Sequence, residues 1–158
     1  MYKREALKAA APDDEFFDED FFSYCEDVDL AFRLRWANWE SYFCPDAIVY
    51  HYGSRTGGTT SNPTIYHSLR NNTWVMFKNL PKGFILKNLH WIIISEIAQL
   101  FFNLIVRRKR IAIKAKIDAY KNLYKMLGKK RKIKRTANYK EIEKFFTMKW
   151  LVRQKTRL

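Results

Sequence analysis

Charge is divided unequally along this chain. Residues 1–60 contain six Lys or Arg and twelve Asp or Glu, a balance of −6, whereas residues 61–158 contain twenty-four and four, a balance of +20. The total of +14 in 158 residues favours a polyanionic partner, either nucleic acid or an anionic membrane. A chain of this length fits one globular domain and is too short for two ordinary ones. We therefore expect an acidic N-terminal part joined to a basic, helical C-terminal part.

The two cysteines, Cys25 and Cys44, are too few for a disulfide framework or a zinc site. Unpaired thiols are typical of proteins in a reducing compartment. Met1 is followed by polar residues rather than by the apolar run of a secretory signal. We therefore expect a protein of a reducing compartment.

Local signals in the first 80 residues predict helices on either side of a strand region. Pro12 stops the first helix, Asn38 follows the second as a C-terminal cap, and Asn62 with Pro63 starts the third. β-rich runs flank a turn at 44–46. The expected elements are a helix over 2–11, a helix over 26–37, strands over 39–43 and 47–51, and a helix over 63–80.

The chain after residue 80 is expected to be helical throughout. The segment 84–106 is nearly long enough to span a bilayer, but its polar residues fall on one stripe, so we expect it to lie in an interface or on a protein surface. Basic runs at 107–110 and 129–135 follow, of a kind that binds anionic headgroups at roughly 1 kcal/mol per residue. Asn138 is predicted to cap a last helix over 139–154. The polar stripe consists of Asn88, Ser95, Glu96, Gln99 and Asn103.

Acidic residues in the segment 16–35 carry the clearest chemical signal. Glu26 and Asp27 open the second expected helix, where the helix dipole favours a negatively charged carboxylate. An ionised aspartate can accept a proton from an attacking hydroxyl. Acidic residues are also common at helix starts because they satisfy the free backbone amides there. The pattern by itself therefore leaves a catalytic and a capping role open.

Three linked motifs stand in order along the first 80 residues. The first motif spans 17–35 and consists of Phe17-Asp18-Glu19, Phe21-Phe22, Tyr24, Glu26-Asp27-Val28-Asp29-Leu30 and Arg33-Leu34-Arg35. The second consists of Pro45, Ala47, Val49 and His51, and the third is Arg70-Asn71. This series resembles the C-terminal half of the catalytic domain in bacterial family 2 glycosyltransferases, especially the rhamnosyltransferase-like branch. Asn38 stands where that family commonly has a glycine, a mild change because Asn also tolerates the left-handed conformation.

The resemblance implies an α/β fold: residues 1–80 would form the acceptor-side half of a GT-A catalytic domain, with helices around a mixed sheet. Residues 81–158 would then be an all-helical, amphipathic and basic tail that associates with an anionic membrane. The implied reaction is an inverting transfer of a sugar from a nucleotide-diphosphate donor to a glycan or lipid-linked acceptor in cell-surface polysaccharide synthesis. The implied location is peripheral, at the cytoplasmic face of the bacterial inner membrane.

The resemblance also implies roles for individual residues. Asp27 would be the general base, and Glu26 and Asp29 would orient it or bind the acceptor. His51 would approach a divalent metal (Mg²⁺ or Mn²⁺) or the leaving diphosphate, and Arg70 would neutralise diphosphate charge. Two segments, Asp18-Glu19-Asp20 and Asp27-Val28-Asp29, match the metal-binding D-x-D of the family as strings, but neither ends a hydrophobic strand, so we assign neither to a metal. The nucleotide-binding half of the family has no counterpart in this sequence. We expect that half to be truncated or to lie on a separate chain.

The basic clusters leave a second class of function open. A non-enzymatic, basic helical protein that binds a membrane surface or nucleic acid would also explain the charge of residues 61–158. That interpretation leaves the acidic first part unexplained. We expect no sequence-specific nucleic acid binding.

Overall fold

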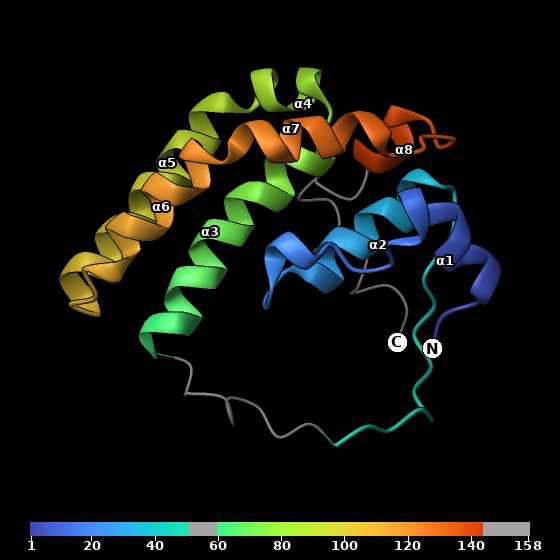
Figure 1. Cartoon of the computed structure of the whole chain (residues 1–158), viewed down its shortest axis with the longest axis horizontal. Coiled ribbons are helices and arrows are strands. Elements are labelled where there is room, and N and C mark those ends of the chain that lie inside the picture. The colour runs from blue at the N-terminus through green and yellow to red at the C-terminus, as the bar shows by residue number, and fades with distance from the viewer. Residues whose placement is uncertain (51–59, 144–158) are drawn as a thin grey trace, which may run out of the picture.

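The structure is a computed structural model and describes residues 1–50 and 60–143. Every regular element in these residues is a helix (Figure 1). The elements are α1 (Arg4–Ala10), η1 (Pro12–Asp14), η2 (Glu19–Phe21), α2 (Glu26–Trp36), α3 (Asn62–Asn79), α4 (Lys82–Lys87), α5 (Leu89–Phe101), the π-helical turn η3 (Phe102–Val106), α6 (Ile111–Lys121), α7 (Leu123–Lys132) and α8 (Tyr139–Glu143).

The expected α/β fold with a mixed sheet is wrong for the described residues. The segment that was predicted to form strands, from 39 to 50, is irregular, and its side chains at Tyr42, Phe43, Val49 and Tyr50 are all at least 84% exposed. A β-strand is stable only when its backbone amides and carbonyls pair with a neighbouring strand. No strand is present within residues 1–50 and 60–143. The β-propensity of segment 39–50 therefore does not produce a strand here, and the described residues form a helical arrangement in place of the GT-A sheet.

The helix boundaries agree with the local signals. α1 ends before Pro12, and Asn38, two residues after the last residue of α2, adopts the left-handed conformation with a φ of 65°. The N-cap of α3 is Ser61, whose Oγ accepts a hydrogen bond from the backbone amide of Thr64 at 3.3 Å, so this helix begins one residue earlier than predicted. Asn138 precedes α8, and its Oδ1 accepts from the amide of Lys140 at 3.0 Å. The remainder of the predicted last helix lies outside the described residues.

α3 is the central helix of the molecule (Figure 1). It packs against α6 and α7 on one side and against α2 on the other, and α1 packs in turn on α2. The rings of Phe21 and Trp74 meet edge to face, with centroids 6.0 Å apart, at the point where the acidic segment reaches α3. The core around this contact contains Phe21, Trp74, Val75, Ala119 and Met126.

Small residues bring α6 close to α3. Ala112, Ala115 and Ala119 are fully buried, and their spacing of three and four places them on one face of α6. Trp74 of α3 donates a 2.9 Å hydrogen bond from Nε1 to the backbone carbonyl of Ala119. The basic second half of the chain is therefore packed directly on the helix that also contacts the acidic first half.

Candidate functional site

The backbone immediately before α2 is in an uncommon conformation. Phe22, Tyr24 and Cys25 have φ angles of 62°, 69° and 67°. Residues with a Cβ rarely adopt this left-handed region, and each such residue costs about 1–3 kcal/mol unless the surroundings enforce it. This turn, residues 22–25, leads straight into Glu26 and Asp27. We call it the left-handed turn.

The buried side chain of Asn71 holds the left-handed turn in place. Its Nδ2 lies 2.9, 2.8 and 2.7 Å from the carbonyl oxygens of Phe21, Ser23 and Tyr24. An amide has only two N–H bonds, so these contacts are partly shared. The three carbonyls converge on one side chain of α3, which fixes the start of α2 relative to the central helix.

Arg70 strengthens the same attachment. Its Nη2 donates to the carbonyl oxygens of Asp20 and Phe21 at 3.0 and 3.1 Å. Its guanidinium lies 4.2 Å from the centroid of the Trp74 ring, which is a cation–π distance. Arg70 was predicted to neutralise diphosphate charge. In this structure its Nη2 group donates to backbone carbonyls, and the role in neutralising diphosphate charge stays a prediction.

Asp27 is the second residue of α2 and is exposed to solvent. Its Oδ1 accepts a 2.8 Å hydrogen bond from the backbone amide of Val28. The free amides and the dipole at a helix N-terminus favour a negative charge at this point. The carboxylate is thus oriented by the backbone on one side while its remaining lone pairs are accessible to a bound hydroxyl.

Glu26 and Cys25 flank Asp27 in a more enclosed environment. The Oε2 atom of Glu26 is shielded from solvent and has no hydrogen-bond partner in the part of the chain that the structure describes. Burial, followed by the charges of Asp27 and Glu26, raises the pKa of the Cys25 thiol to about 11. The start of α2 is therefore a region of concentrated negative charge.

Asp29, one turn further along, is completely buried. Its Oδ2 accepts from Nε of Arg33 at 2.9 Å and from Nζ of Lys78 at 2.8 Å, and its Oδ1 accepts from the amide of Asn79 at 2.8 Å. Lys78 also donates to Asp18 at 2.7 Å. These contacts tie α2 to α3, so the geometry favours an orienting role of Asp29 over direct contact with an acceptor, and either role stays a prediction.

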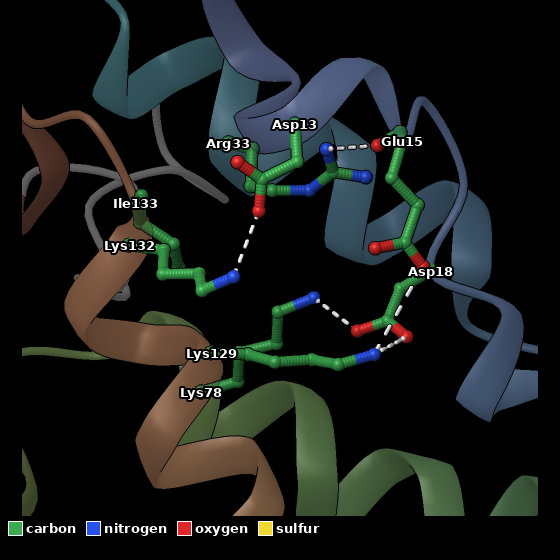
Figure 2. A pocket seen from close by; sticks show the side chains of 8 residues that line it. All are labelled: Asp13, Glu15, Asp18, Arg33, Lys78, Lys129, Lys132 and Ile133. Atoms are coloured by element: carbon green, nitrogen blue, oxygen red, sulfur yellow. Dashed lines mark hydrogen bonds and ion pairs between the residues drawn. The ribbon is translucent and has the colours of Figure 1, made fainter.

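Asp18, Asp29, Arg33, Lys78 and Lys129 together form what we call the buried ion cluster. Figure 2 shows the side chains of Lys78 and Lys129 directed at the carboxylate of Asp18. Burial alone would raise the pKa of Asp18, but the charges and hydrogen bonds of the two lysines outweigh it and lower the pKa below its ordinary value. The adjoining pocket has a volume of about 50 Å³. That is room for one or two water molecules and far too little for a nucleotide sugar.

Three residues of α3 were missed as site residues by the sequence analysis. Asn71 and Lys78 hold the left-handed turn and the ion cluster, and His67 lies beside the turn, with its ring centroid 5.2 Å from that of Phe22. Burial, and then the charge of Arg70, lowers the pKa of His67. Asn71, Trp74 and Lys78 recur at spacings of three and four, so one face of the predicted helix carries polar residues among apolar ones. That pattern was the available signal for buried polar contacts.

The expected divalent metal depends on His51 and on a strand-end D-x-D motif that this sequence does not supply. His51 lies outside the described residues. Within residues 1–50 and 60–143, no group of three His, Cys, Asp or Glu side chains could hold a metal ion. The divalent metal therefore stays a prediction, and no chemical step is assigned to one here.

One helical segment among the described residues is long and apolar enough to cross a membrane. It is Leu89–Val106, which covers α5 and η3, with 18 residues and a mean hydropathy of 1.7. Length and composition are the only grounds for this, and they are weak for a single segment.

The chain is similar over half its length to a known glycosyltransferase. An 84-residue stretch is 33% identical to N-acetylglucosaminyl-diphospho-decaprenol L-rhamnosyltransferase from Mycobacterium tuberculosis, in strain CDC 1551 / Oshkosh and equally in strain ATCC 25618 / H37Rv. The stretch is 52% of this chain and 26% of those proteins, so the match spans about a quarter of the curated relatives' length. No protein-family model and no solved structure matches the chain. The chain thus has a partial, glycosyltransferase-type relationship.

Proposed function

We propose that this chain provides the acceptor-side part of an inverting glycosyltransferase of family 2, with Asp27 as the general base. The observation that carries this proposal is the placement of Asp27: an exposed carboxylate at a helix N-terminus, behind a strained turn that Asn71 clamps. The similarity to a rhamnosyltransferase supports the reaction class. The donor would be a nucleoside-diphosphate sugar, with L-rhamnose as the first candidate.

In this reaction Asp27 takes the proton of an acceptor hydroxyl. The hydroxyl oxygen forms the new bond to the anomeric carbon, the bond from that carbon to the diphosphate oxygen breaks, and the nucleoside diphosphate leaves with the bonding electrons. A fixed general base contributes about 10²–10⁴-fold to such a step. The clamped turn serves this function because it keeps the carboxylate in one position, and a small displacement would reduce proton transfer.

The acceptor would be a sugar linked through a diphosphate to a polyprenol, as in the name of the relative. Such an acceptor lies in a membrane, which favours a peripheral location at the cytoplasmic face of the bacterial inner membrane. A divalent metal is expected for the full-length enzyme, and none of the steps above depends on it.

The test is sugar transfer by the gene product, co-expressed with any adjacent reading frame that encodes a nucleotide-binding half. Nucleoside-diphosphate L-rhamnose and a panel of other nucleoside-diphosphate sugars are supplied with N-acetylglucosaminyl-diphospho-polyprenol. We expect Asp27→Asn to reduce turnover by about 10²-fold or more while nucleoside-diphosphate binding, measured by calorimetry, is retained.

Asp46→Asn is the matched control, because Asp46 is also exposed but lies in the irregular segment before residue 50. It should leave turnover unchanged. Near-normal transfer by Asp27→Asn would exclude Asp27 as the base. Failure of every donor in the panel would overturn the proposed reaction class.

A further inference from the structure

Helix α5 exposes most of its large apolar side chains, while Leu100 packs against the core between α3 and α6. None of its residues is buried. Trp91, Ile97 and Phe101 are each more than 60% exposed, and Ile105 and Val106 of η3 continue the surface at 60% and 62%. The amphipathic helix of an ordinary globular protein directs its apolar stripe at the core. We call this exposed surface of α5 and η3 the apolar face.

The polar stripe of α5 contacts the rest of the protein. Glu96, only 13% exposed, pairs with Lys116 of α6 at 2.8 Å and accepts from Oγ1 of Thr73 in α3 at 3.2 Å. Gln99 accepts from the amide of Asn72 at 3.3 Å. The usual orientation is therefore largely reversed: Glu96 and Gln99 are directed at the rest of the protein, and most of the large apolar side chains are directed into the surroundings. Contact of such a large apolar surface with water is energetically unfavourable.

Basic residues border the apolar face at its C-terminal end. Arg107, Arg108 and Arg110 follow η3 directly and are exposed. The guanidinium of Arg107 lies 5.0 Å from the ring centroid of Phe102, so the charged and apolar surfaces are continuous. Between residues 47 and 117 the sequence has a single acidic residue, Glu96, and its charge is already paired with Lys116. This surface combines apolar area with uncompensated positive charge.

We propose that α5 and η3 lie in the interface of an anionic lipid bilayer. The apolar face enters the boundary between headgroups and acyl chains, and residues 107–110 bind the anionic headgroups. The charge complementarity selects lipid over a second copy of this strongly basic chain. This surface is separate from the start of α2, so the inference holds whether or not the protein transfers a sugar.

The contacts of α5 favour lying in the interface over crossing the membrane. Figure 1 shows α5 alongside α6, and the Glu96–Lys116 pair joins the two helices. α6 also carries the exposed residues Lys114 and Lys121. A crossing α5 would either bring these charges into the hydrocarbon or break its polar contacts, and both are costly. A helix in the plane of the interface keeps α3 and α6 on the aqueous side.

The test is flotation of the full chain with vesicles of phosphatidylcholine alone and of phosphatidylcholine mixed with phosphatidylglycerol. We expect binding to the mixed vesicles, weakened by high salt. Ile97→Glu with Phe101→Glu should reduce binding about tenfold or more, because two apolar side chains that would enter the bilayer are replaced by charges. Arg107→Glu with Arg110→Glu should remove the preference for phosphatidylglycerol. Ile48→Glu is the matched control, since Ile48 is 74% exposed but outside this surface.

A second measurement reports where the helix lies. Brominated lipids should quench part of the tryptophan fluorescence, and because the chain has five Trp, the quenching should be clearly smaller in Trp91→Phe than in the wild type. Circular dichroism of each variant establishes that it is folded. Four results would overturn the proposal. The first two are unchanged vesicle binding by the folded Ile97→Glu, Phe101→Glu variant and retention in vesicles after alkaline carbonate extraction, which indicates a spanning helix. The others are binding of nucleic acid but not of vesicles, and concentration-dependent dimerisation that Ile97→Glu abolishes, which would assign the face to a second copy.

Discussion

The side-chain amide of Asn71 lies 2.7 Å from the carbonyl oxygen of Tyr24, 47 residues earlier in the chain. Tyr24 is in the left-handed conformation, with a φ of 69°, and precedes the candidate base Asp27 by three residues. One buried polar side chain on the central helix thus maintains an unfavourable backbone conformation at the start of α2. The stability of this arrangement can be measured without any assay of activity.

Asn71→Ala should destabilise the protein by about 3 kcal/mol, because it leaves the carbonyl groups of the left-handed turn buried without their donor. The measurement is urea unfolding followed by circular dichroism. Asn72→Ala is the neighbouring control: Asn72 is exposed and makes one 3.3 Å hydrogen bond, to Gln99. It should change the free energy of unfolding by less than about 0.5 kcal/mol. Equal effects of the two variants would contradict the clamp.

The sequence was sufficient to predict features that depend on neighbouring residues. Helix ends were predicted within a residue or two because their causes are local, such as Pro12 after α1 and Asn38 after α2. The predicted strands were wrong because a strand needs a partner strand from elsewhere, and the β-propensity of segment 39–50 carries no information about that partner. Asn71 and Lys78 were missed as site residues for the same reason, since their partners are about 50 and 60 residues away.

Lys78→Met should destabilise the protein by about 3 kcal/mol. Lys78 lies between Asp18 and Asp29, and its removal leaves two buried carboxylates with fewer compensating charges. Lys87→Met is the control, because Lys87 is 71% exposed and pairs with Glu143 at the surface. Its effect should stay under about 1 kcal/mol. A Lys78 variant as stable as the Lys87 variant in urea unfolding would show that the ion cluster contributes little to stability.

Acid should weaken the protein through Asp18. The folded state lowers the pKa of Asp18 below 3.8, so folding favours its carboxylate form. The resulting stabilisation is complete above the unfolded pKa and is lost as the pH falls through the lowered, folded pKa. Asp18→Asn should therefore be clearly less stable than the wild type at about pH 6, and this difference should shrink at about pH 3. Asp46→Asn, at an exposed position, should show no such convergence, and a constant difference for Asp18→Asn would count against the lysine contacts.

The reactivity of Cys25 reports on the charge of Asp27. With a pKa of about 11, roughly one in a thousand Cys25 thiols is ionised at pH 8, whereas an ordinary thiol is ionised to roughly a quarter. In Cys44→Ser, alkylation of Cys25 by iodoacetamide should therefore be about a hundredfold slower than alkylation of the exposed Cys44 in Cys25→Ser.

Burial is the largest cause of the raised Cys25 pKa and the negative charge of Asp27 is the next, so Asp27→Asn should lower the Cys25 pKa and accelerate its alkylation. The comparison is made in the Cys44→Ser background across a range of pH, with Asp46→Asn as the control. An unchanged pH profile in folded Asp27→Asn would mean that Asp27 carries no charge beside Cys25. Because a general base must be ionised before it can accept a proton, that result would also count against its proposed role.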